Sequence, residues 1–168
     1  MMWTQQKKSD FLDENELRRA AVDLLSRRDY SRLELFRKLN SRCEHPDVLE
    51  RVLDDLQQRQ WQSDQRFAES FINSRFSRGL GPVRIKQELR EKGISAETIS
   101  LVLEAFEGDW YDNALHTLKK KYDSLKENDP NRKQKLYRFM AYRGFTQDHI
   151  AYALDEIGSI SDNGSPDF

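Results

Sequence analysis

The residues of this sequence that could do chemistry are mostly arginines and lysines beside short apolar stripes. Six of them lie between positions 75 and 92: Arg75, Arg78, Arg84, Lys86, Arg90 and Lys92. Helical periodicity places Lys86 and Arg90 on one flank of an apolar stripe, whereas Arg84 shares the other flank with two glutamates that partly neutralise it. Because such cations bind anions, we take these six as the first candidates for contact with a nucleic acid or an acidic protein surface.

The same basic character recurs along the chain, although the formal net charge is only −1. Segments 26–42, 75–92 and 119–143 carry net charges of +4, +4 and +6, and segments 44–56, 93–118 and 144–168 carry −4, −5 and −5. The outer basic segments supply secondary candidates: Arg37, Lys38, Lys133, Lys135 and Arg138. Two interpretations stay open, because the basic and acidic segments either face different partners or pair with each other.

Patterns typical of catalysis or metal binding are not found in the sequence. Its three histidines stand beside no cysteine or acidic cluster of metal-ligand spacing, and the single Cys43 is typical of a buried structural thiol. Gly79-Leu-Gly81 is neither preceded by a strand nor followed by the Lys-Ser/Thr of a phosphate loop. We expect both glycines to supply turn conformations and Pro82 to start a helix. The sequence therefore predicts no catalytic residue, no metal ion and no cofactor.

The elements that must position the basic residues are helices, because apolar residues recur at helical spacing and no segment alternates like a strand. One apolar pattern occurs three times, at intervals of 50 and 51 residues: Leu35, Leu39, Leu49, Leu53 and Leu56; Ile85, Leu89, Ile99, Leu103 and Phe106; Leu136, Met140, Ile150, Leu154 and Ile157. Expected helix starts are Asp13, Ser31, Ser63 or Asp64, Ser95, Asp129 before Pro130, and Thr146. The pattern predicts an all-α protein of about nine helices in three tandem three-helix repeats.

We place these repeats at residues 13–61, 62–107 and 108–157, between a polar N-terminal tail (1–12) and a flexible C-terminal tail (158–168). Charged residues make up 34% of the chain and hydrophobic ones 37%, which favours an elongated, curved, solenoid-like body over a sphere. No apolar run is long enough to span a membrane, and none near the start is typical of a signal peptide. Because a single cysteine cannot form an internal disulfide, the chain is expected to be cytoplasmic. We also expect it to be a monomer.

The middle repeat resembles that of the RecX family of regulators of the recombinase RecA. The residues that carry the resemblance are Trp61, Asp64, Arg66, Phe67, Ala68, Arg78, Gly79, Gly81, Pro82, Ile85, Leu89, Lys92 and Gly93. The segment from Arg28 to Leu39 is similar to the family's opening motif, and Phe139 to Gly144 is similar to its last repeat. The resemblance covers roughly Leu17 to Ile157.

Membership of this family implies a regulator without catalytic activity of its own. It would bind RecA and the RecA–DNA filament and inhibit RecA's ATPase, strand exchange and coprotease activities, thereby regulating DNA repair and the SOS response. The alternative is a protein that binds DNA directly, in which the three-helix units resemble helix-turn-helix modules and place a basic helix in a groove. Auxiliary non-specific contact with single- or double-stranded DNA fits either hypothesis.

Overall fold

The computed structural model describes residues 10–162, and throughout this range the secondary structure is helical, without strands. The helices are α1 (Glu14–Arg27), α2 (Arg32–Leu39), a short 3-10 turn η1 (Asn40–Arg42), α3 (Pro46–Gln58), α4 (Asp64–Ser77), α5 (Pro82–Glu91), α6 (Ala96–Ala105), α7 (Trp110–Ser124), α8 (Arg132–Tyr142) and α9 (Gln147–Asp162). The predicted nine α-helices in three groups of three are confirmed.

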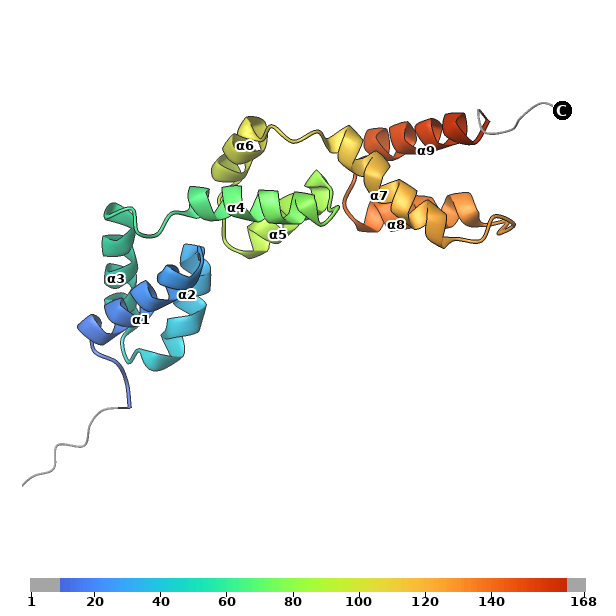
Figure 1. Ribbon diagram of the computed structural model, residues 1–168. Coiled ribbons are helices and arrows are strands. Elements are labelled where there is room, and N and C mark those ends of the chain that lie inside the picture. Colours follow the sequence, from blue (N-terminus) through green and yellow to red (C-terminus); the bar gives the residue numbers. More distant parts are fainter. Residues whose placement is uncertain (1–9, 163–168) are drawn as a thin grey trace, which may run out of the picture.

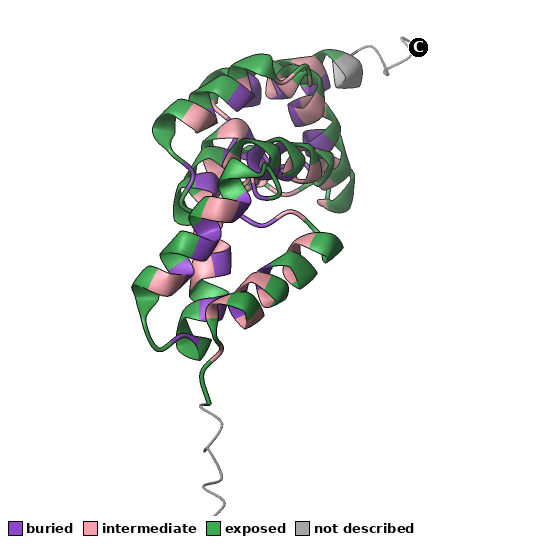
Figure 2. Cartoon of the chain, turned by 90° about the vertical axis from the view of Figure 1, so that its left-hand side faces the viewer, coloured by how far each residue is buried: buried purple, intermediate pink, exposed green. Residues whose placement is uncertain are grey.

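The three groups lie one after another along an arch, with α1–α3 at one end and α7–α9 at the other (Figure 1). Each group has a hydrophobic core of its own, and Figure 2 shows the buried residues on the inward sides of the helices. The more extensive helix contacts all join helices of one group, such as α1 with α3, α4 with α6 and α7 with α9. The expected elongated, curved body is confirmed, and each of its three groups of helices has a separate core.

Most helix starts agree with the sequence expectation. Asp13 and Ser31 form complete capping boxes, and Ser63 and Ser95 accept hydrogen bonds from the third residue beyond them. The expectation for Asp129 is wrong, because α8 begins at Arg132. The Asp129 carboxylate instead accepts a hydrogen bond from the backbone N–H of Asn131 (2.9 Å), which holds a turn before the helix.

The second and third repeats change direction at matching glycines. Gly93 and Gly144 follow the ends of α5 and α8 with φ of +80° and +89°, a conformation that side chains disfavour. Each is followed by a buried apolar residue and then by a hydroxyl that caps the next helix. At Thr146 the cap is reciprocal, because its N–H donates to Nδ1 of His149 (3.3 Å) and its hydroxyl accepts from the His149 N–H (3.2 Å).

The backbone angle expected at Gly81 needs correction, and parts of both expected tails fall outside the described residues. Gly81 has a φ of −88°, so the turn does not require a glycine for its backbone angle there, whereas Gly79 does have a positive φ of 75°. Helix α9 runs to Asp162, past the expected boundary of the third repeat at Ile157. Residues 1–9 and 163–168 of the expected tails lie outside the described residues.

Candidate interaction surface

The middle helices of the three repeats lie end to end. The N-terminus of α5 has no side-chain cap, because its N-cap residue is Gly81. Carbonyl groups at the end of α8 take that role: the Gly81 N–H donates to the Arg143 oxygen (2.8 Å) and the Val83 N–H to the Gly144 oxygen (2.9 Å). A side chain at Gly81 would meet the Gly144 oxygen at 2.3 Å. Glycine is needed here because two backbones touch, and α8 thereby leads directly into α5.

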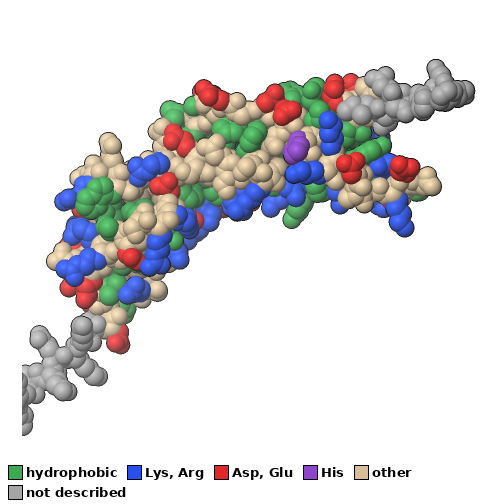
Figure 3. All heavy atoms as spheres, in the orientation of Figure 1, with side chains coloured by type: hydrophobic (Ala, Val, Ile, Leu, Met, Phe, Trp, Pro, Cys, Tyr) green, Lys and Arg blue, Asp and Glu red, His purple; other side chains and the backbone are tan. Residues whose placement is uncertain are grey.

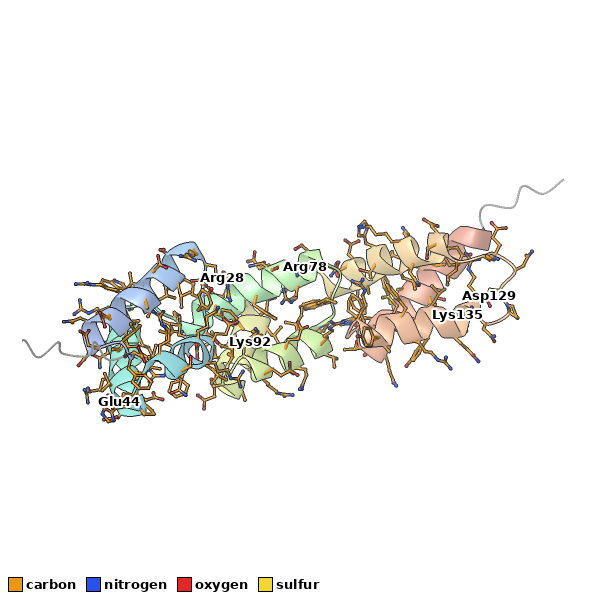
Figure 4. The ribbon with its side chains drawn as sticks, turned by 90° about the horizontal axis from the view of Figure 1, so that it is seen from below. Arg28, Glu44, Arg78, Lys92, Asp129 and Lys135 are labelled. Carbon is orange, nitrogen blue, oxygen red and sulfur yellow. The ribbon has the colours of Figure 1, made fainter. Side chains whose placement is uncertain are left out.

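The other end of α5 meets the start of α2, here through side chains. The buried Ser31 hydroxyl donates to the carbonyl of Lys92 at 2.7 Å, and the Lys92 ammonium pairs with Glu34 at 2.8 Å. Burial alone would raise the pKa of Glu34, but hydrogen bonds from Lys92, Ser31 and Arg28 outweigh it and hold the pKa below its ordinary value. Lys92 therefore joins two repeats; Figure 4 labels it where α5 meets α2.

This alignment brings the candidate cations of three separate segments into one line. We use the term basic strip for the exposed basic side chains of α2, α5 and α8 that form no ion pair within the described residues. They are Arg37, Lys38, Lys86, Arg90, Lys133 and Arg138. In the central part of Figure 3, Lys and Arg side chains gather along the lower, concave edge, and acidic side chains dot the opposite, upper edge. The charge segregation in the sequence is therefore also a segregation in space.

Four of the candidates from the sequence are instead partly neutralised. As expected, Arg84 pairs with Glu88 (3.4 Å). The same carboxylate also pairs with Arg75 on α4 (3.2 Å), which the helical pattern of α5 alone does not reveal. Lys92 is held by Glu34, and Lys135 pairs with Asp129 at the start of α8, where both are labelled in Figure 4.

The remaining candidates keep more of their charge available. Lys86, Arg90, Lys133 and Arg138 are exposed. Arg37 donates one hydrogen bond, to the Glu91 carbonyl (3.3 Å), and the Lys38 ammonium lies 5.9 Å from the centre of the Tyr30 ring. Arg78 is exposed at the end of α4 and lies away from the strip, in a hollow lined by α7.

Apolar side chains that the sequence reasoning missed accompany the strip at the α5–α8 junction. Tyr142 is 78% exposed and Val83 is 55% exposed. Together with Lys86 and Arg90 they line a shallow hollow of about 640 Å³, and the Arg84 guanidinium lies 5.1 Å from the centre of the Tyr142 ring. The available signal in the sequence was that Val83 lies off the Ile85–Leu89 stripe of α5 and Tyr142 lies off the Leu136–Met140 stripe of α8. An exposed aromatic ring between cations is typical of a contact surface.

The two interpretations of the charge pattern apply to different repeats. In the first repeat, Arg32 of α2 pairs with Glu50 (2.6 Å) and Asp54 (2.7 Å) of α3. Burial alone would lower the pKa of Arg32, but these hydrogen bonds outweigh it and raise the pKa. No ion pair joins α5 to α6 or α8 to α9 among residues 10–159, whose side chains the structure describes. Within this range, the basic and acidic helices of the second and third repeats therefore do not neutralise each other by ion pairs.

No group of three His, Cys, Asp or Glu side chains between residues 10 and 159, the side chains that the structure describes, is placed to hold a metal ion. Burial lowers the pKa of His149, whose ring caps α9. Cys43 is buried as expected, and its thiol donates to the His45 carbonyl (2.9 Å). Within the same range, no helix has the length and apolar character needed to cross a membrane.

Comparison with known proteins matches the whole repeat array. Models of the first, second and third three-helix domains of RecX match residues 18–56, 63–103 and 107–154. The chain is 42% identical over 132 residues to "Regulatory protein RecX" of Haemophilus influenzae (strain PittEE), covering 77% of this chain and 87% of that protein. It is also 42% identical over 149 residues to the protein of that name from Mannheimia succiniciproducens, covering 88% and 93%.

Solved structures agree with the fold. The crystal structure of RecX from Lactobacillus salivarius superposes with a TM-score of 0.72 at 22% identity, covering 86% of this chain and 96% of that one. A second crystal structure, of a regulatory protein RecX, gives a TM-score of 0.73 at 23% identity, covering 88% and 82%. These likenesses extend over all three repeats. From its domain matches and its relatives, the chain belongs to the RecX family of regulatory proteins.

Proposed function

We propose that this protein is a cytoplasmic regulator that binds RecA and its filament on DNA, inhibits the ATPase, strand-exchange and coprotease activities of RecA, and thereby regulates DNA repair and the SOS response. It acts as a monomer, by binding rather than by catalysis. The observation that carries the proposal is the family membership, together with a row of basic helices that suits a long partner.

The basic strip supplies the contact surface in this proposal. Helices α2, α5 and α8 have 8, 10 and 11 residues, which at 1.5 Å per residue amounts to roughly 45 Å of helix. Lys86 and Arg90 stand at its centre, are exposed, and are joined by no ion pair to the helices around them. A repeating row of cations complements an anionic surface that itself repeats, as a filament of identical subunits on DNA does. The protein would lie along the filament and bridge neighbouring subunits.

The test is the RecA ATPase rate on single-stranded DNA, titrated with the folded protein. We expect the rate to fall as the protein is added, and an unchanged rate at every stoichiometry would refute the proposal. The double variant Lys86→Glu/Arg90→Glu should need at least about tenfold more protein, because like charges across an interface cost several kcal/mol and about 1.4 kcal/mol already lowers affinity tenfold. Its matched control, Arg19→Glu/Lys119→Glu, makes the same charge change on exposed positions of α1 and α7 and should inhibit like the natural chain.

The alternative is direct DNA binding, which the exposed Tyr142 beside Lys86 and Arg90 favours, since aromatic rings between cations also stack on bases. A helix-turn-helix mode through α5 is disfavoured, because residues near the N-terminus of a recognition helix contact bases, and here the carbonyls of α8 cover that end. If tight DNA binding with a steep salt dependence occurred without any effect on RecA, it would favour this alternative.

A further inference from the structure

A hollow of about 480 Å³ lies at the junction of the second and third repeats, apart from the basic strip. It is lined by the end of α4, one face of α7 and the end of α8. None of the six residues of the basic strip lines it. Arg78, which Figure 4 labels at the end of α4, stands at one wall. The contact surface proposed above leaves this hollow without a role.

The lining of this hollow is cationic and contains no carboxylate. The charged or ring-nitrogen side chains in it are Arg78, His116, Lys120, Lys121 and Arg143. The remaining polar side chains are hydroxyls and one amide. The chain as a whole has 29 acidic residues against 28 basic ones, so an acid-free lining departs from its average surface. Such a set of hydrogen-bond donors attracts an anion and repels a cation.

Helix α7 makes most of this lining by presenting one stripe. Residues 113, 116, 117, 120, 121 and 124 line the hollow, and they follow the spacing of three and four that keeps side chains on one face of a helix. The acidic Asp112 and Asp123 of the same helix stand off this stripe and do not line the hollow. The separation of donors from carboxylates is therefore a property of the sequence of α7.

Two of the cations are already held in position. The Arg143 guanidinium donates to the Arg78 carbonyl (2.7 Å) and lies 5.0 Å from the centre of the Phe139 ring. The Lys121 ammonium lies 5.1 Å from the same ring. Neither is joined to a carboxylate by an ion pair among residues 10–159, whose side chains the structure describes. The one hydrogen bond of Arg143 to Arg78 uses only part of the five N–H groups of its guanidinium. Cations fixed in this way lose little entropy when an anion binds.

Lys120 and Arg78 complete the set at the mouth of the hollow, where both are exposed. We propose that the hollow binds a phosphate group, because a guanidinium and several ammonium groups around one point suit its oxygens. The volume exceeds that of a phosphate alone, so the group would belong to a larger molecule. That molecule is either a single strand of nucleic acid or a free nucleoside triphosphate, and the chemistry of the pocket is the same for both.

The experiment compares two adjacent lysines. Lys119 and Lys120 are both exposed on α7, but only Lys120 lines the hollow. Binding of a fluorescently labelled oligothymidine and of labelled ATP is measured for the natural chain, Lys119→Glu and Lys120→Glu. We expect Lys120→Glu to weaken at least one ligand about tenfold, as the loss of a charge-assisted hydrogen bond would, and Lys119→Glu to change affinity less than about twofold.

The ligand that responds identifies the source of the phosphate. If the oligonucleotide responds, Lys120→Gln should also reduce the slope of log affinity against log salt by about 0.7, the value for one phosphate contact on a single strand. If Lys119→Glu and Lys120→Glu weakened ligand binding equally, the proposal would be overturned, because the effect would then reflect only the overall positive charge of α7. The proposal would also be overturned if the natural chain bound neither the oligothymidine nor ATP. The RecA ATPase titration is independent of these outcomes.

Discussion

Gly81→Ala tests whether backbone contact between α8 and α5 is what aligns the basic helices. The added methyl would lie 2.3 Å from the Gly144 oxygen and 2.4 Å from the Phe145 nitrogen, against 3.4 Å or more for ordinary contact. These neighbours are backbone atoms that cannot rotate away, so the two repeats must separate by about 1 Å. The φ of −88° suits alanine, which confines the effect to this contact.

The expected cost follows from the hydrogen bonds that cross the junction. A shift of about 1 Å would break the bonds from the Gly81 and Val83 N–H groups, now 2.8 and 2.9 Å long. Each contributes about 0.5–1.5 kcal/mol, and the buried Gly81 N–H left without an acceptor adds about 1–3 kcal/mol. Alanine recovers about 0.4–1 kcal/mol by restricting the unfolded chain. We therefore expect a net loss of about 1–6 kcal/mol in the free energy of unfolding.

Urea unfolding measures this loss, and amide hydrogen exchange locates it at Gly81 and Val83, whose protection should fall. Gly158→Ala is the matched control, because a methyl there meets nothing within 4 Å and the residue lies within α9. It should stabilise the protein by up to about 1 kcal/mol through helix propensity. Unchanged stability and unchanged exchange in Gly81→Ala would refute the reasoning about the junction.

Two further predictions concern stability. Glu34→Gln should cost about 1–3 kcal/mol at neutral pH, because Lys92 and Arg28 lose a charged partner. The pKa of Glu34 is lowered in the folded state, so its contribution to the free energy of unfolding is present above its ordinary pKa of 4.5 and is lost as the pH falls through the lowered value. The urea midpoints of the natural chain and of Glu34→Gln should therefore converge in acid. Midpoints that stay apart at low pH would contradict this. Leu89 is fully buried, so Leu89→Ala should lower the free energy of unfolding in urea by about 2–5 kcal/mol. Amide hydrogen exchange should rise first in α4–α6, whose core contains Leu89. An equal rise in exchange in all three repeats would argue against separate cores.

Most of the fold could be predicted because its signals are local. The repeating apolar pattern depends on residues three and four apart, and the caps at Ser31 and Ser95 satisfy backbone groups within one turn. Asp129 was misplaced because an Asp before a turn and an Asp before a helix use the same side-chain hydrogen bond. Gly81 was expected to serve a backbone angle, whereas the contact that requires it comes from Gly144 in another repeat.

The candidate surface was predictable in composition but not in arrangement. The sequence indicated which helices are basic, and the exposure of Lys86 and Arg90 follows from their place beside an apolar stripe. The pairings that neutralise Lys92 and Arg75 join different helices, so no periodicity within one helix reveals them. The acid-free hollow at Lys120 likewise needs α4, α7 and α8 together.

Photo-crosslinking tests most directly whether the basic strip faces the RecA filament. A benzophenone amino acid replaces Lys86 on α5 or, as the matched position, Glu104 on α6, both exposed. Each variant is irradiated with RecA assembled on single-stranded DNA. We predict crosslinks to RecA or to the DNA from position 86 and at most weak ones from position 104. Efficient crosslinking from position 104 with none from position 86 would contradict the account.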